Sequence, residues 1–139
     1  MADDVALNKA GIIERCLARV REVHASDDAH LLSDPTRQDS ILLNLQRAGE
    51  AAIDLAMHLV RKHRLGLPQE SREAFDLLER AGLLDPDSAR AMRAMVGFRN
   101  VAVHSYRELD LEIVRTIVHE RLPDFEAFAS HVVRNLAHD

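Results

Sequence analysis

The sequence predicts an all-α protein, an up-and-down helical bundle of four main helices plus a short helix. Apolar residues recur at three- and four-residue steps almost throughout, and no segment shows the two-residue alternation of a strand. Glycine (5) and proline (4) are few among the 139 residues, which is typical of long helices joined by few turns. Because 47% of the residues are hydrophobic, a single domain over residues 1–139 can bury a sizeable core.

The first helix is expected over Val5 to His24, where apolar residues recur with helical spacing and charged residues occupy the other side. A connection over residues 26–35 follows. Its acidic residues and proline end the first helix, and Asp34 or Thr36 is expected to cap the next one.

The second helix is expected from Arg37 to Arg64 and has a broad apolar face. The segment 66–68, Gly-Leu-Pro, ends it. A short third helix is expected from Arg72 to Ala81, with Ser71 as its cap and Gly82 as its stop.

The fourth helix is expected to start at Asp85-Pro86, because an acidic cap followed by proline is a strong start signal. The helical pattern breaks over residues 105–110. A fifth helix begins near Leu111 and continues to the end of the chain, except that Pro123 must break or kink it.

The most informative segment is residues 99–106, Arg-Asn-Val-Ala-Val-His-Ser-Tyr, which places polar groups in apolar surroundings. Arg99 supplies a fixed, positively charged fork that suits phosphate oxygens. His104 carries the side chain best able to accept and donate a proton near neutral pH. Together these two groups are the minimum needed to cleave a phosphodiester without a metal ion.

Helical geometry limits how these residues can meet. At ~100° per residue, Arg99 and Tyr106 lie almost in register, whereas His104 lies ~140° around the helix from Arg99. Either the helix loosens between Val103 and Tyr106, or a second copy of the chain completes the site. The apolar residues Ala102 and Val103 are expected to pack against a neighbour.

The spacing Arg-x4-His-x-Tyr resembles the signature of the HEPN superfamily of all-helical ribonucleases, and most closely the HepT toxins of HepT–MntA toxin–antitoxin pairs. The chain length, the succession of helices and the acidic, amide-bearing segment 44–54 fit the same family. The resemblance implies a HEPN-like fold and an RNA endonuclease that needs no metal or other cofactor. It also implies a homodimer whose two motifs meet in a cleft between the subunits.

The resemblance implies a role for each residue of the motif. His104 would be the general base or acid, and Arg99 would hold the phosphate and stabilise its developing charge. Asn100 would orient His104 or donate to the phosphate. Tyr106 would be the residue to which an MntA-like nucleotidyltransferase antitoxin attaches AMP, giving O-AMP-tyrosine; alternatively, Tyr106 packs its ring and has a structural role only.

A second set of polar residues shares one face of the second helix: Arg47, Glu50, Asp54, His58 and Arg61. This set is either a solvated stripe of ion pairs or part of the cleft opposite the motif. In the second case, Glu50 or Asp54 would position Arg99 or His104.

The composition excludes several classes of protein. The single cysteine, Cys16, forms no internal disulfide, and the eight histidines form no HExxH pair, so no metal site is expected. No segment approaches the ~18 consecutive apolar residues that a membrane span requires. The acidic N-terminal segment 1–4 lacks the basic region of a signal peptide, so a cytoplasmic location is expected.

The formal net charge of −5 disfavours a simple RNA-binding module, because phosphate contacts usually come from a basic surface. Residues 90–121 hold six arginines and four acids, a local excess of +2 that would suffice for a basic cleft. The sequence therefore predicts a toxin endoribonuclease of a type VII-like toxin–antitoxin pair. The alternative is a catalytically inactive HEPN bundle that binds a partner protein or a nucleotide.

Overall fold

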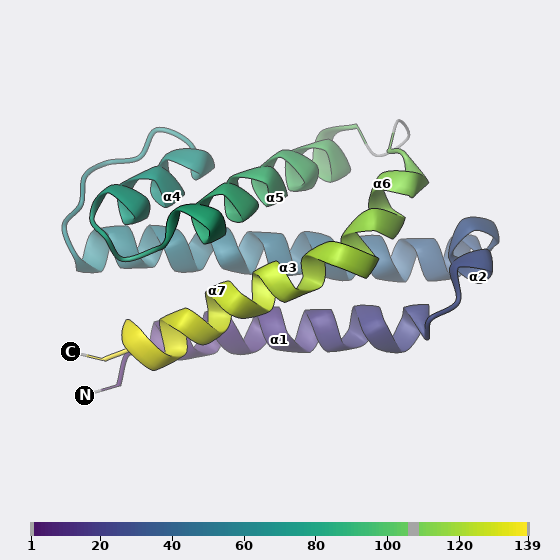
Figure 1. The fold of residues 1–139 in the computed structure, drawn as a ribbon, viewed down its shortest axis with the longest axis horizontal. Coiled ribbons are helices and arrows are strands. Elements are labelled where there is room, and N and C mark those ends of the chain that lie inside the picture. The colour runs from purple at the N-terminus through teal and green to yellow at the C-terminus, as the bar shows by residue number, and fades with distance from the viewer. Residues whose placement is uncertain (1, 106–108, 139) are drawn as a thin grey trace.

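The computed structural model describes residues 2–105 and 109–138, which form an up-and-down helical bundle (Figure 1). Its long elements run in alternating directions, and the short helices α2 and α4 lie in the connections between them. The elements are α1 (Asp4–His24), α2 (Asp28–Ser33), α3 (Pro35–Lys62), α4 (Ser71–Arg80), α5 (Pro86–His104), α6 (Leu111–Thr116), the π-helical turn η2 (Ile117–Arg121) and α7 (Leu122–Asn135). The predicted all-α bundle is confirmed.

The connection after α1 contains a helix that the sequence analysis did not predict. Helix α2 has only six residues, too few for a periodic apolar pattern to be visible. The side chain of Asp27 caps it by accepting a hydrogen bond from the backbone N–H of His30 at 3.1 Å. Leu31 is its one buried residue and anchors the helix to the core.

The start of α3 resolves the choice of cap. Asp34, and not Thr36, is the N-cap residue, because its carboxylate accepts from the backbone N–H of Thr36 at 2.9 Å. At α4 the expected cap was wrong. Ser71 is the first helical residue, and the Glu73 side chain instead accepts from the backbone N–H of Gln69 at 3.1 Å, one turn before it.

Helix α5 begins as predicted, with Asp85 accepting from the N–H of Ser88 at 3.0 Å and Pro86 in the first turn. It remains α-helical through His104 and ends at Ser105. The helical part of the motif therefore has regular α-helical geometry.

The predicted interruption at Pro123 is confirmed and takes the form of a π-helical turn. Because Pro123 has no N–H, the regular α-helical bond to the carbonyl four residues earlier, that of His119, cannot form. The turn η2 spans that carbonyl, and α7 restarts at Leu122 with Pro123 in its first turn. The chain thereby passes from α6 to α7 without a loop.

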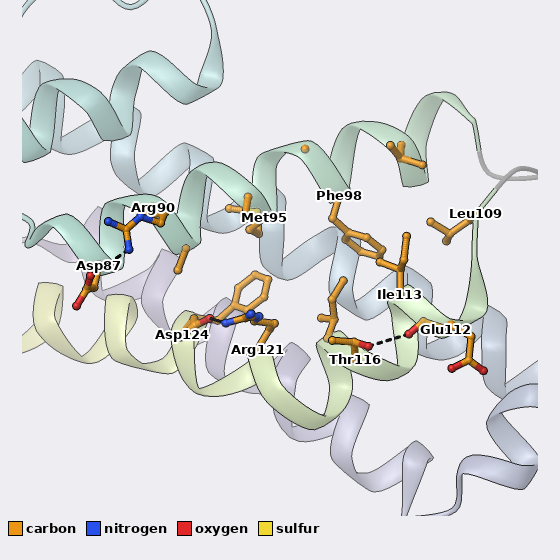
Figure 2. Close-up of a pocket in the computed structure, with 16 residues that line it drawn as sticks. Asp87, Arg90, Met95, Phe98, Leu109, Glu112, Ile113, Thr116, Arg121 and Asp124 are labelled. Atoms are coloured by element: carbon orange, nitrogen blue, oxygen red, sulfur yellow. Dashed lines mark hydrogen bonds and ion pairs between the residues drawn. The ribbon is translucent and has the colours of Figure 1, made fainter.

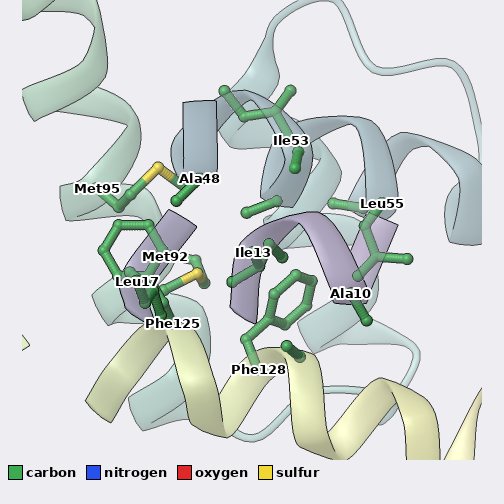
Figure 3. Close-up of a cluster of buried hydrophobic side chains, with 14 of the residues drawn as sticks. Ala10, Ile13, Leu17, Ala48, Ile53, Leu55, Met92, Met95, Phe125 and Phe128 are labelled. Atoms are coloured by element: carbon green, nitrogen blue, oxygen red, sulfur yellow. The ribbon is translucent and has the colours of Figure 1, made fainter. Parts of the chain in front are cut away.

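The buried residues form one hydrophobic cluster between α1, α3, α5 and α7 (Figure 3). Phe75 and Phe128 are fully buried, and their rings meet edge to face with centroids 5.6 Å apart. Within the described ranges 2–105 and 109–138, no helix is both long and apolar enough to cross a membrane.

Candidate active site

The end of α5 that carries the motif lies very close to α3. A Cβ atom at Gly49 on α3 would lie 3.0 Å from Sδ of Met95 and 3.4 Å from Cβ of Arg99. A larger residue at position 49 would therefore require the side chains of Met95 and Arg99 to shift. The glycine fixes how closely Arg99 approaches α3.

Arg99 is held by polar groups but its hydrogen-bonding capacity is only partly used. Its Nη1 donates to Oδ1 of Asn100 at 3.0 Å, and its Nε lies 3.9 Å from Oε1 of Glu50. The buried Nε has no hydrogen-bond partner among the described residues, which costs about 1–3 kcal/mol. The side chain as a whole is 27% exposed, so the remaining part of the guanidinium can meet an anionic ligand such as phosphate.

His104 is the last residue of α5 and its side chain is exposed. The backbone N–H of the next residue, Ser105, donates to the carbonyl of Val101 at 2.8 Å and closes the helix. Because α5 stays α-helical from Arg99 to His104, the two side chains leave the helix axis ~140° apart. The helix does not loosen before His104 to bring them together.

Asn100 contacts Arg99 and not His104, so within the described chain it does not orient the imidazole. Tyr106 lies outside the described residues. Of the three apolar residues between Asn100 and His104, Ala102 is buried, whereas Val101 and Val103 are 43% and 40% exposed. Ala102 and Val103 were both expected to pack against a neighbour. Within the described chain this holds for Ala102, which is buried, but not for Val103.

The polar face of α3 does not act as one unit. Asp54 binds Nζ of Lys9 on α1 at 3.1 Å and has no hydrogen bond or ion pair with the described motif residues 99–105. Nε2 of His58 donates to the carboxylate of Asp3 at 2.7 Å. Glu50 is the residue of this face that lies against Arg99, and its Oε1 also accepts from the side-chain amide of Gln46 at 3.3 Å.

Most of the positive charge counted from the sequence is neutralised locally. The ion pairs are Arg90 with Asp87, Arg93 with Asp76 and Glu79, Arg115 with Glu112 and Asp28, and Arg121 with Asp124. The local excess of +2 therefore overstates the cationic surface that RNA would meet. Arg99 differs in degree, because its carboxylate contact, to Glu50 at 3.9 Å, is longer than the contacts of these arginines.

A largely apolar groove of about 830 Å³ separates α5 from the α6–η2–α7 run. Figure 2 shows Phe98 and Ile113 facing each other across it. Val101 and Ile113 line this groove and are 43% and 50% exposed. The groove was not predicted from the sequence. Its one visible signal was the apolar segment 101–103, which lies between the polar residues Asn100 and His104.

The fold and the motif together define a HEPN-type helical domain, an all-α bundle with Arg-x4-His at the end of one long helix. The sequence profile of the ribonuclease HepT-like family matches residues 13–132, and the chain belongs to that family.

Known proteins resemble the chain over about half to nearly all of its length. The mRNA nuclease HepT of Shewanella oneidensis is 44% identical over 126 residues, which cover 91% of this chain and 94% of that protein. The tRNA nuclease HepT of Aphanizomenon flos-aquae is 35% identical over 66 residues, 48% of this chain and 45% of that protein. A solved structure of the tri-AMPylated Shewanella oneidensis HEPN toxin in complex with an MNT antitoxin superposes with a TM-score of 0.90. It is 42% identical and covers 95% of this chain and 98% of the toxin.

Proposed function

We propose that this chain is a metal-independent endoribonuclease toxin, acting as a single HEPN-like domain and restrained by an MNT-type nucleotidyltransferase antitoxin. The observation that carries the proposal is the state of two side chains at the end of α5. Among the described residues, Arg99 meets a carboxylate only at 3.9 Å and is 27% exposed, and His104 is exposed. Relatives described as nucleases and as an antitoxin-bound toxin support the same function.

The cleavage step uses the neighbouring ribose hydroxyl. His104 accepts the proton of the 2′-hydroxyl, and the resulting oxygen attacks the adjacent phosphorus. The bond from phosphorus to the 5′-oxygen of the next nucleotide breaks, and that oxygen takes a proton from an imidazolium. Arg99 binds the non-bridging phosphate oxygens and stabilises the charge that builds on them.

A homodimer would supply the second imidazole. The separation of ~140° around α5 prevents Arg99 and His104 of one chain from facing the same point on a straight helix. The exposed apolar residues Val101, Val103 and Ile113 near this end give a second copy a surface on which to pack. In the dimer, one His104 acts as base and its counterpart as acid.

The antitoxin would act by AMP addition to Tyr106, two residues after His104. Each AMP would add negative charge and bulk to the motif, which would compete with the RNA phosphate for Arg99 and obstruct the cleft. The solved complex of a tri-AMPylated toxin with its antitoxin supports this mode of control for a relative.

Expression and cleavage assays test the nuclease proposal. The wild-type chain, expressed alone, should arrest growth and shorten cellular RNA, and the purified protein should cleave RNA in the presence of a chelator. Arg99→Ala and His104→Ala should abolish both effects while leaving the circular dichroism spectrum unchanged. His63→Ala, which changes an exposed histidine at the end of α3, is the matched control and should stay active.

A harmless, folded wild-type protein that cleaves neither mRNA nor tRNA would overturn the proposal and favour the inactive partner-binding bundle. For the antitoxin, intact mass after co-expression should show added AMP on the wild type and none on Tyr106→Phe. Neutralisation without added mass would leave occlusion by the antitoxin as the mode of control.

A further inference from the structure

Three side chains outside the motif meet where α1, α2 and η2 come together. Nε2 of His24 and Nε2 of His119 each lie 2.7 Å from Oδ1 of Asp28. The three ligand atoms all lie within 4.8 Å of one another, although His119 is 91 residues away from Asp28 in the sequence. The two imidazole rings stand almost perpendicular, with their centroids 5.3 Å apart.

The burial of these groups is graded from the core outward. His24 is only 7% exposed, whereas the side chains of Asp28 and His119 are 32% and 46% exposed. One imidazole is thus fixed in the protein interior, and the other two ligands leave one side of the cluster open to solvent. Hydrogen bonds from His24 and then from His119 lower the pKa of Asp28, so its carboxylate is ionised at neutral pH.

We infer that His24, Asp28 and His119 form a binding site for one divalent transition-metal ion, with Zn²⁺ as the best-matched cation. Two imidazole nitrogens and one carboxylate oxygen are the ligand types that zinc prefers, and water on the open side would complete a tetrahedron. The ion would take the place of the two hydrogen bonds that now join the imidazoles to the carboxylate, with the proton of each neutral imidazole carried on Nδ1.

The geometry requires only a small adjustment. Ligands at ~2.1 Å from a tetrahedral zinc ion lie roughly 3.4 Å apart, so each present contact of 2.7 Å must lengthen by about 0.7 Å. His119 belongs to the π-helical turn, and Asp28 begins a helix of six residues, so neither ligand is fixed by a long rigid element. Both can move outward while the buried His24 stays in place.

One neighbouring charge opposes the cation. Nη1 of Arg115 lies 3.7 Å from Oδ2 of Asp28, and its Nη2 binds Glu112 at 2.9 Å. A cation in the site would meet this guanidinium, which weakens binding. The inference therefore predicts that removing the Arg115 charge raises the affinity for Zn²⁺.

The site would fix one wall of the apolar groove. Thr116, Ile117 and Arg121, from the same stretch as His119, line that groove. A bound ion would tie this stretch to the end of α1 and to α2. This role does not depend on catalysis, because the three ligands are separate from Arg99 and His104.

The test uses chelator-treated full-length protein and follows thermal unfolding and isothermal titration with Zn²⁺ and, separately, Mg²⁺. Zn²⁺ should bind once per chain and raise the unfolding temperature, and Mg²⁺ should do neither because it prefers oxygen ligands. His119→Ala and Asp28→Asn should each lower the Zn²⁺ affinity at least ~10-fold, whereas Arg115→Gln should increase it.

His30→Ala is the matched control, because His30 lies on α2 and pairs with Asp27 instead. It should leave the Zn²⁺-induced shift intact. The readout is the increment caused by Zn²⁺ in each variant, so a variant that is merely less stable does not imitate the result. No Zn²⁺ binding by the wild type, or an equal increment in His119→Ala and His30→Ala, would overturn the inference.

Discussion

The two halves of α5 use arginine in opposite ways. Arg93, in the half that packs against α4, has Nη1 3.1 Å from Asp76 and 2.8 Å from Glu79. The hydrogen bond that Arg93 donates to Glu79 and the charges of both carboxylates raise the pKa of Arg93 above its usual value. Arg99, six residues further along, has one carboxylate at 3.9 Å and a buried Nε without an acceptor.

This difference separates a structural cation from a functional one. The two side chains are similarly exposed, 30% for Arg93 and 27% for Arg99, so burial alone does not distinguish them. What differs is whether the surrounding chain supplies the acceptors. A guanidinium that donates to two carboxylates of the protein, as in Arg93, links two helices. A guanidinium with N–H groups that lack an acceptor can donate them to a ligand.

The largest expected effect comes from exchanging the two arginines for alanine one at a time. Arg99→Ala should reduce RNA cleavage by about 100-fold or more, because it removes the charge that stabilises the transition state, with little change in unfolding temperature. Arg93→Ala should retain cleavage and lose about 1–2 kcal/mol of stability, because Asp76 and Glu79 lose their shared donor. Cleavage rates and thermal unfolding of both variants check the contrast, and equal losses of activity would contradict it.

The next prediction concerns Gly49, where α3 packs closely against α5 beside Arg99. Gly49→Val should cost about 1–3 kcal/mol of stability and lower cleavage, because its side chain would displace Met95 and Arg99. Gly11→Ala is the control, since its Cβ would meet only the tip of Arg15 at 3.2 Å within α1. It should raise stability by about 0.5–1 kcal/mol through helix propensity. Denaturant unfolding measures both, and a neutral Gly49→Val would mean that the two helices separate freely.

The helices were predictable because their signals are local. The pair Asp85-Pro86 starts α5 as a cap and first residue, and Pro123 interrupts the last helix because it lacks an N–H. Ser71 was misassigned as a cap because its neighbour Glu73 closes the helix start through its own side chain. The six-residue α2 was missed because one buried residue, Leu31, leaves no periodic pattern.

The arrangement of the site was only partly predictable. The roles assigned to Arg99 and His104 rest on the family motif, whereas the proximity of Arg99 to Glu50 depends on how α5 crosses α3. Helical spacing alone places Glu50 and Asp54 on one face of α3. In the folded chain, Asp54 forms an ion pair with Lys9 on α1. The meeting of His24, Asp28 and His119 is beyond sequence reasoning, because it joins two ligands near the start of the chain to a third one 91 residues later.

A smaller effect is expected at Asp3, whose carboxylate accepts several hydrogen bonds, in contrast to the partly paired guanidinium of Arg99. The side chain of Asp3 is only 8% exposed and binds His58 at 2.7 Å and Lys62 at 3.0 Å. Burial acts to raise the pKa of Asp3, but the hydrogen bonds from the Ala6 N–H, His58 and Lys62 together outweigh it and lower the pKa well below its usual value. The charged carboxylate therefore stabilises the fold above pH ~4, and this contribution is lost as the pH falls.

Asp3→Asn should accordingly lower the stability by about 1–3 kcal/mol at pH 7 and by progressively less below pH ~4. Chemical unfolding across this pH range measures the difference from the wild type. A gap that stays constant down to pH ~2 would show that the asparagine fails for reasons of packing and not of charge.

The smallest expected effect concerns the carboxylate beside Arg99. If Glu50 positions the guanidinium, Glu50→Gln should lower kcat while it lowers KM, because the freed arginine binds phosphate more readily but is less well oriented. Both changes should be roughly two- to threefold, as the pair is partly exposed and its Nε to Oε1 distance is 3.9 Å. Asp54→Asn removes the same charge one turn further along α3, where it binds Lys9 and not Arg99. If both variants lower KM equally and leave kcat unchanged, Glu50 acts only through the overall charge of the protein. A fall in kcat confined to Glu50→Gln would instead show that the partial pairing of Arg99 is what holds it ready for the phosphate.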